Sequence, residues 1–158
     1  MEDLHVSYLK LLREVGTSLD RLSALAQEKT RVVRQNDLLG LDEVLKQEQA
    51  MTLNLRGLEL RRQKLVPQLG LEGSPLSALP DKFPENLENL ARQTAENLRQ
   101  SYEAYRGYAS MARNTLELNL HEIEKIIASS GADPKLAAAG YESPGTEPPK
   151  NMKTDFRA

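Results

Sequence analysis

The sequence predicts an all-α fold, an elongated antiparallel bundle of three main helices with a flexible C-terminal tail. Apolar residues recur at steps of three and four through three long segments, which is the spacing of one helix face. Most prolines and glycines fall between or after these segments. Only 4% of the 158 residues are aromatic and none is cysteine, so the expected core is aliphatic, without disulfides or thiolate metal sites.

The first helix is expected at residues 3–35, where leucine and valine line one broad face. Residues 36–41 interrupt the pattern with asparagine, aspartate and glycine, and we interpret them as a tight connection between two antiparallel helices. Asp42 is the expected N-cap of the second helix, because its carboxylate can accept hydrogen bonds from the free N–H groups of the first turn.

The second helix is expected at residues 42–69 and ends where Gly70 follows, the usual place for a glycine cap. Glu48 and Arg62 fall on its apolar face, where each either extends its charge to the edge of the core or meets a polar neighbour. Residues 70–83 are rich in glycine, serine and proline but also hold large apolar side chains. We expect this loop, with one short helical turn at its serine-proline pair, to pack across the end of the bundle.

The longest helix is expected at residues 84–128, because Pro84 and Glu85 suit a first turn and no further proline follows. At a rise of ~1.5 Å per residue it would reach roughly 65 Å, longer than a compact domain of this size needs. Its apolar face must therefore lie along partner helices or offer a part of itself to another molecule.

Residues 1–128 are expected to form one helical bundle domain, and residues 129–158 a flexible tail. Asp133 and Pro134 suit the cap of one short helix in that tail. Beyond it the segment is dominated by proline, glycine and scattered charge, so apolar burial is too small to offset the entropy of ordering it.

The net charge of -2 and the mixed charge of the helix surfaces argue against a nucleic-acid-binding face. The N-terminus lacks the basic and apolar regions of a signal peptide, and no run of about eighteen apolar residues marks a membrane span. We therefore expect a cytoplasmic protein without membrane insertion.

The sequence indicates neither an enzyme nor a bound cofactor or metal. His5 and His121 belong to no spacing of metal ligands, and the glutamates beside His121 form only a fragment of the pattern used by helical di-metal sites. No glycine-rich phosphate loop occurs, and Ser129 and Ser130 have no histidine partner in a recognisable order. A ligand-binding or metal-binding four-helix bundle is therefore disfavoured.

Tyr102, Tyr105, Tyr108 and Met111 recur at steps of three along the longest helix. Steps of three drift around a helix, so these four side chains cannot all face one core. Some are expected to be exposed and to mark a contact surface. The alternative is that the rings only cover the shoulder of the bundle.

The chain resembles the FlgN family of flagellar export chaperones in three features. The first is Asn-Asp-Leu-Leu at 36–39, before a charged second helix that closes on Leu-Gly-Leu at 69–71. The second is the end of the longest helix at 113–127, which reads Arg-Asn-Thr-Leu-Glu-Leu-Asn-Leu-His-Glu-Ile-Glu-Lys-Ile-Ile. The third is a loose tail in which Tyr141 and Gly145 match the family's Tyr-x-x-x-Gly element, although the residues between them depart from its usual glycine, alanine and aspartate run.

The resemblance implies a cytoplasmic chaperone that holds hook-filament junction proteins, the hook-associated subunits, before their export. The family binds the amphipathic terminal helical segment of these subunits, which otherwise self-associate, and delivers them to the export gate protein FlhA. A long helix with an apolar face suits this task because it can bury a partner's amphipathic segment, with the tail ordering on contact. The resemblance also implies a docking role for Tyr141.

The partner-binding hypothesis places the bound segment on the apolar face of the longest helix. The alternative is that the same residues only pack on the first two helices, and it applies most to the half nearest Leu98. Past Leu116 binding is favoured if the first two helices are too short to cover the face. The candidate partner-binding residues are Leu98, Tyr102, Tyr105, Ala109, Ala112, Leu116, Leu120, Ile123, Ile127 and, in the tail, Tyr141.

The alternative function is a self-assembling coiled-coil structural or scaffold protein, because the same apolar face would also drive assembly. The two functions differ in the expected oligomeric state. A chaperone of this kind is expected to be a monomer or a weak homo-oligomer, whereas a scaffold forms a stable oligomer at low concentration.

Overall fold

The computed structural model describes residues 2–130, which are largely helical. Helix α1 (Glu2–Arg34) is followed by α2 (Leu38–Gln68), and a crossing segment leads into the longest helix, α4 (Glu88–Ser130). The predicted all-α fold with three main helices is confirmed. The crossing segment holds three short turns, namely the 3-10 turn η1 (Leu76–Ala78), the one-turn helix α3 (Leu79–Lys82) and the 3-10 turn η2 (Glu85–Leu87).

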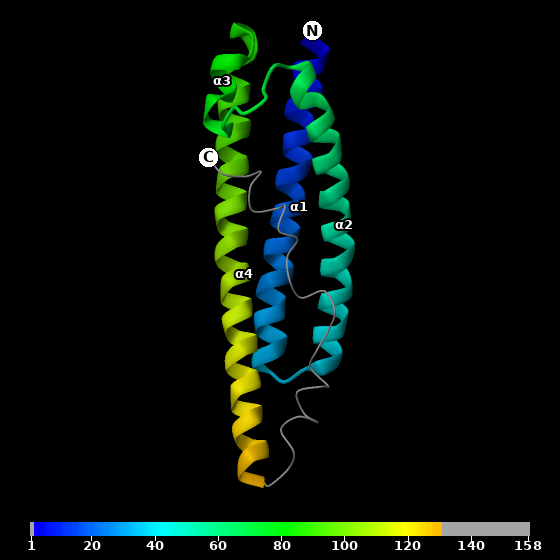
Figure 1. Cartoon of the computed structure of the whole chain (residues 1–158), viewed down its shortest axis with the longest axis vertical. Helices are drawn as coiled ribbons and strands as arrows, with labels where there is room; N and C mark the ends of the chain where they lie inside the picture. The colour runs from blue at the N-terminus through cyan, green and yellow to red at the C-terminus, as the bar shows by residue number, and fades with distance from the viewer. Residues whose placement is uncertain (1, 131–158) are drawn as a thin grey trace.

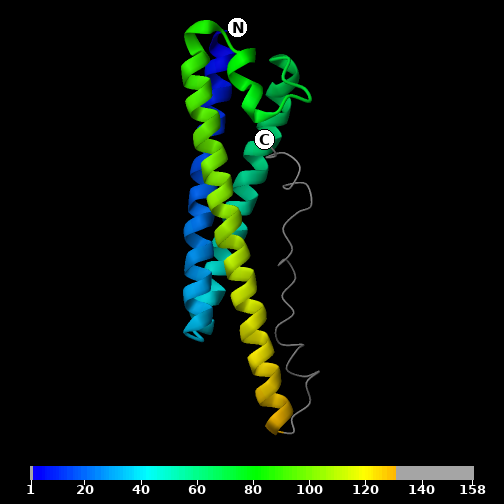
Figure 2. The same cartoon turned by 90° about the vertical axis from the view of Figure 1, so that its left-hand side faces the viewer.

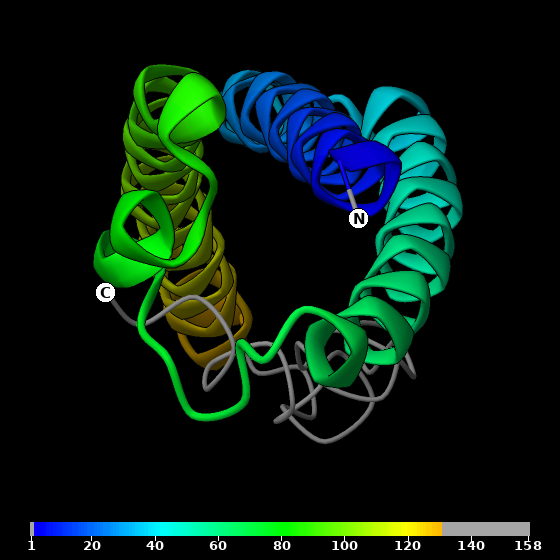
Figure 3. The same cartoon turned by 90° about the horizontal axis from the view of Figure 1, so that it is seen from above.

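Helix α1 is the middle helix of the bundle, with α2 on one side and α4 on the other (Figure 1). The chain runs up through α2 in the direction opposite to α1, and the crossing segment then turns it so that α4 runs parallel to α1 (Figures 1 and 2). Seen from above, the three helices follow an arc with α2 and α4 at its ends (Figure 3). The closest backbone approaches among the long helices are those of α1 with α2 and of α1 with α4.

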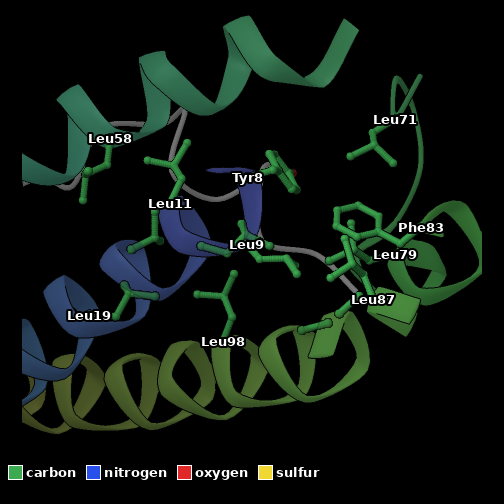
Figure 4. Packing of buried hydrophobic residues seen from close by; sticks show 14 of the residues in the cluster. Tyr8, Leu9, Leu11, Leu19, Leu58, Leu71, Leu79, Phe83, Leu87 and Leu98 are labelled. Atoms are coloured by element: carbon green, nitrogen blue, oxygen red, sulfur yellow. The ribbon is translucent and has the colours of Figure 1, made fainter. Parts of the chain in front are cut away.

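The core is aliphatic, as the composition predicts. Leu9, Leu11 and Leu19 of α1 are buried and lie between Leu58 of α2 and Leu98 of α4 (Figure 4). All five side chains belong to one buried cluster. Because α1 supplies the middle of this cluster, burial of its apolar surface couples the two outer helices to each other.

The connection between α1 and α2 is tighter than the sequence suggests. Asn36 adopts a left-handed conformation with φ of +55°, and the Asp37 N–H donates to the carbonyl oxygen of Val32 at 2.9 Å. These are the features of a Schellman motif, in which a left-handed residue ends a helix and satisfies its last carbonyl groups. The Asp37 carboxylate then accepts a hydrogen bond from the Gly40 N–H at 2.9 Å, so it caps the next helix.

The expectation that Asp42 caps the second helix is therefore wrong. Asp37 takes part both in ending α1 and in beginning α2, so α2 starts at Leu38 and the predicted connection at 36–41 is mostly helical. Asp42 lies inside α2 and pairs with Lys46 at 3.0 Å on the surface.

The end of α2 and the crossing segment follow the prediction. Gly70 has φ of +66°, and the Leu71 N–H donates to the carbonyl oxygen five residues earlier at 3.0 Å, so glycine ends the helix in a second Schellman motif. Leu71, Leu79 and Phe83 are buried against the end of the bundle (Figure 4). The rings of His5 and Phe83 pack edge to face with 4.7 Å between their centroids. This contact joins the start of α1 to the crossing segment.

The longest helix begins slightly later and ends slightly later than predicted. Pro84 precedes the turn η2, and the Leu87 N–H donates to its carbonyl oxygen at 2.9 Å. The α-helix proper starts at Glu88 and continues to Ser130. Of residues 129–158, only Ser129 and Ser130 are described, so the predicted tail and its short helix lie outside the described residues.

Glu48 and Arg62, the two charged residues on the apolar face of α2, both meet polar neighbours. Glu48 forms an ion pair with Lys29 of α1 at 2.7 Å. Arg62 pairs with Glu59 at 2.6 Å and hydrogen-bonds with Tyr8 of α1. Burial opposes the charge of Arg62, but these hydrogen bonds outweigh it and hold the pKa of the guanidinium above its ordinary value.

Candidate partner-binding surface

The first half of α4 places its apolar face on the rest of the bundle. Leu98 and Ala112 are buried, and Leu98 is part of the core cluster. A Cβ atom added to Gly16 of α1 would lie 3.9 Å from a methyl group of Leu98, an ordinary contact distance, so α1 and α4 lie side by side here. The side chains at these two candidate positions are therefore buried inside the bundle.

Tyr102 and Tyr105 are half-buried and pack against the same cluster. Burial raises the pKa of the Tyr105 hydroxyl, and the negative charge of Glu48 raises it further. Since Glu48 is paired with Lys29, this tyrosine lies beside an ion pair that joins α1 to α2. Both tyrosines therefore stabilise the bundle with one part of the ring and leave another part accessible.

The structure confirms the expectation that the four side chains at steps of three do not all face the core. Tyr108 and Met111 are exposed, whereas Tyr102 and Tyr105 are half-buried. Tyr108 and Met111 line a shallow recess of about 340 Å³ with residues of α1, among them Thr30. None of the candidate partner-binding residues lines this recess, so it does not extend the candidate surface.

The last part of α4 extends past the end of the other two helices (Figures 1 and 2). The Asn119 amide donates to the side-chain oxygen of Asn36 at 3.1 Å, which places Asn119 at the level of the α1–α2 connection. Residues 120–130 lie beyond that level, a length of roughly 16 Å at ~1.5 Å per residue. The first two helices therefore end before this part of the apolar face.

Four candidate residues from Leu116 onwards are half-buried, namely Leu116, Leu120, Ile123 and Ile127, and Ala109 further back is half-buried too. Leu118 and Ile126, which the sequence reasoning did not select, are exposed by 67% and 66%. They do not belong to the selected stripe, but their large apolar type in this otherwise charged segment was a signal that could have found them. Leu118 points to the opposite side of the helix from Leu116 and Leu120, so we define the distal α4 surface as Leu116, Leu120, Ile123, Ile126 and Ile127.

Charged residues around the distal α4 surface are mostly acidic. Glu117, Glu122 and Glu124 are exposed, and Lys125 is the one lysine or arginine between residues 114 and 130. An amphipathic segment with basic residues at its edges would therefore fit this surface in charge as well as in shape.

A cavity of about 590 Å³ lies at the opposite end of the bundle, between the end of α2 and the first half of α4. Tyr8 and Leu12 of α1 line it together with Arg62, Leu76 and Leu98. Its lining includes Arg62, which is already paired with Glu59. We assign no ligand to it.

Neither a metal site nor a membrane-crossing helix is found in the described part of the chain. Among residues 2–130, no three histidine, aspartate or glutamate side chains come together in a way that could hold a metal ion. No helix in that range combines the length and apolar character needed to cross a bilayer. His5 is engaged with Phe83, and His121 is exposed on the last part of α4.

The comparisons with known proteins place the chain in a family. The family model described as FlgN protein matches residues 5–149, which includes the whole of α2 and α4 and nearly all of α1. No curated protein and no solved structure matches the chain. The match covers most of the chain, so this protein belongs to the FlgN family of flagellar export chaperones.

Proposed function

We propose that this protein is a cytoplasmic chaperone for hook-filament junction proteins. It binds the amphipathic terminal helical segment of these subunits, prevents their premature self-association and delivers them to the flagellar type III export gate. The family membership supports a chaperone role in flagellar export, and we propose that the protein acts without enzymatic activity. The identity of the bound subunits and the export gate partner, FlhA, are our proposal.

The observation that carries this proposal is the distal α4 surface. Leu116 and Leu120 begin a row of apolar side chains that continues past Asn119, where α1 and α2 have ended. Among residues 2–130 no other helix lies along this part of the face, and such a face is suited to accept a partner helix at positions three and four residues apart. Leu98 and Ala112 are already buried, so we assign them to the bundle core and centre the cargo site on the distal residues.

Tyr141 lies outside the described residues, and its proposed role rests on the resemblance to the family's Tyr-x-x-x-Gly element. We propose that the segment around it contacts FlhA. Deleting residues 131–158 is therefore expected to abolish binding to FlhA while cargo binding by the helices is retained.

The test is calorimetric titration of purified hook-filament junction subunits into the full chain and its variants. Leu120→Asp and Ile123→Asp are expected to raise the dissociation constant at least about tenfold, because each places a charge inside an apolar contact. Leu60→Asp is the matched control, since Leu60 is an exposed leucine on the outer face of α2. It should bind like the unmodified chain.

Two results would contradict the proposal in different ways. Absence of binding to any junction subunit would refute the proposed cargo. Normal binding by Leu120→Asp and Ile123→Asp, with both variants folded by circular dichroism, would keep the chaperone function but refute the distal α4 surface as its site.

A further inference from the structure

The distal α4 surface is an apolar strip with acidic edges, and no other helix among residues 2–130 lies along it. Its residues continue the face that α4 packs on α1, past the level where α1 and α2 end (Figures 1 and 2). At about 100° per residue, Glu117 and Glu124 lie along one edge of the strip, and Glu122 lies past the other edge. Lys125 lies on the side of the helix opposite to the strip. A segment that covers the strip therefore meets carboxylates at its sides.

The charges of the surroundings do not reverse this sign. Arg113 is exposed one turn before Glu117, at the end of the strip that is nearest to the bundle. At the α1–α2 connection Asp37 adds a carboxylate, since its neighbour Asn36 contacts α4. Arg34 lies further into the bundle, where it lines the shallow recess described above. From residue 117 onwards the strip is therefore bordered mainly by negative charge.

Residues 150–157 of the same chain have the composition that such a strip requires. They read Lys-Asn-Met-Lys-Thr-Asp-Phe-Arg and follow two prolines, which suit the first turn of a helix. Met152 and Phe156 are four residues apart, so they would share one helix face. The segment has three basic residues and one acidic residue, a net charge of +2, whereas residues 117–130 have three acidic residues and one lysine, a net charge of -2. The two are complementary in apolar spacing and in charge.

The segment is also within reach of the strip. Residues 131–149 separate it from the end of α4. From Ser130 back to Leu116 the distance is roughly 21 Å at ~1.5 Å per residue, and a connection of this length can extend to roughly 65 Å. The sequence predicts a flexible connection, for which the root-mean-square length is roughly 24 Å. A connection that matches the span in this way gives an effective concentration near its maximum, on the order of 1 mM.

We propose that residues 150–157 dock on the distal α4 surface of their own chain, as a short helix antiparallel to α4. Met152 and Phe156 pack on the apolar strip. The basic residues of the segment lie along the edge that holds Glu117 and Glu124, where each lysine or arginine can pair with a carboxylate.

The antiparallel orientation follows from the two edges of the segment. In a helix over residues 150–157, Lys153 and Arg157 lie on one side of the apolar pair and Asp155 lies on the other. When this helix runs antiparallel to α4, its basic side coincides with the edge that holds Glu117 and Glu124. A parallel helix would instead bring Asp155 to these two carboxylates, which disfavours that orientation.

Docking of the segment makes it a competitor of the cargo, because both would use the same strip. This competition rests on the proposed function, whereas the docking itself does not. Two apolar anchors suit an intrinsic dissociation constant of about 0.1 mM, so at an effective concentration of about 1 mM the strip is covered about nine-tenths of the time. Cargo that binds more tightly than the segment displaces it, and weaker apolar contacts are excluded.

The first experiment uses fluorescence, because the chain contains no tryptophan. Phe156→Trp places a single reporter in the segment of the full chain, which is measured at about 1 μM, far below the effective concentration within one chain. Its emission is expected at a shorter wavelength than in urea. Adding Ile123→Asp should increase quenching by acrylamide at least about threefold, since the docked fraction falls. Leu120→Asp is a second variant, and circular dichroism verifies that each chain is folded.

Leu118→Asp is the matched control for these variants. Leu118 is exposed by 67% on the opposite side of the same helix, so its replacement should change neither the emission nor the quenching.

Charge reversal tests the orientation. Glu117→Lys with Glu124→Lys makes one edge of the strip basic and should increase the quenching. Adding Lys153→Glu and Arg157→Glu to the same chain restores opposite charges on that edge, so the quenching should return toward its original value. A control chain with two acid-to-lysine changes at exposed positions away from the strip should behave like the unmodified one; the positions are Asp20 and Glu103.

Titration with hook-filament junction subunits tests the competition. Met152→Ala with Phe156→Ala removes the anchors and is expected to tighten cargo binding about three- to tenfold. Unchanged cargo affinity in this variant would overturn the competition. Absence of cargo binding by every chain would refute the proposed function, while the tryptophan readings still decide the docking.

Three results would overturn the docking itself. They are tryptophan emission equal to that in urea, equal effects of Ile123→Asp and Leu118→Asp, and a failure of the charge-swapped chain to recover.

Discussion

The cavity at the upper end of the bundle predicts that two buried leucines of the same core respond differently to truncation. Leu98 is 3% exposed and lines the cavity of about 590 Å³, whereas Leu19 is 0% exposed and is not among its lining residues. The perturbation is the same for both, Leu98→Ala and Leu19→Ala. Any difference in the cost therefore comes from the surroundings of the two side chains.

Each substitution removes three carbon atoms, which corresponds to about 2–3 kcal/mol of lost transfer free energy at ~0.8 kcal/mol per carbon group. In an enclosed site a further term of ~24 cal/mol per Å³ of new cavity is added, about 2 kcal/mol for a leucine-sized space. At Leu98 the new space joins an existing cavity, so most of this second contribution is absent. We expect about 2–3 kcal/mol for Leu98→Ala and about 4–5 kcal/mol for Leu19→Ala.

The assay is urea-induced unfolding followed by circular dichroism, at one fixed chain concentration because self-association would shift the midpoint. The denaturant slope of both variants should match that of the unmodified chain. Equal losses of about 4–5 kcal/mol at the two positions would refute the reasoning, because they would mean that the bundle is closed around Leu98.

Two further predictions concern the α1–α2 connection and the tyrosine series. A Cβ atom at Gly40 would overlap the Asp37 carboxylate, so Gly40→Ala should displace this cap and lower the free energy of unfolding in urea by about 1–2 kcal/mol. Gly107→Ala is the control at an open helical position and should raise the free energy of unfolding by up to ~1 kcal/mol. A gain at both positions would contradict the capping role of Asp37. The raised pKa of Tyr105 means that the folded state keeps the phenol proton when the unfolded state has lost it, so the stability falls as the pH rises above about 10. Tyr105→Phe should therefore lose less stability than the unmodified chain between about pH 8 and about pH 11, and identical losses would show that Tyr105 titrates as it does when unfolded.

The helix ends were predictable where a single residue type decides them. Gly70 ends α2 because a left-handed conformation is favourable for glycine, and this preference is visible in the sequence. The start of α2 was misassigned because Asp37 and Asp42 are equally good caps by residue type. What decides between them is the left-handed Asn36, a backbone geometry that the residue type permits but does not require.

The apolar face of α4 could be predicted from the sequence. Which of its residues pack in the core and which are left for a partner could not. Leu98 and Leu120 occupy equivalent places in the apolar repeat, and they differ only because α1 ends at Arg34 while α4 continues. That difference depends on how the helices are aligned along the bundle axis. The exposure of Leu53 and Leu60 on α2 was missed for another reason. Leucines on two opposite faces weaken the periodicity of both, so Leu53 and Leu60 gave no separate signal.

The central position of α1 has a consequence for the order in which the protein is made. The face of α1 that packs on α4 has no partner until the ribosome has synthesised the chain from Arg34 to Ala112, which is roughly 80 residues. At about 5–20 residues per second this takes about 4–16 s, long compared with the time in which a helix forms. For those seconds the nascent α1–α2 hairpin presents an uncovered apolar face, so a member of a chaperone family begins with a helix that itself has no partner to cover it.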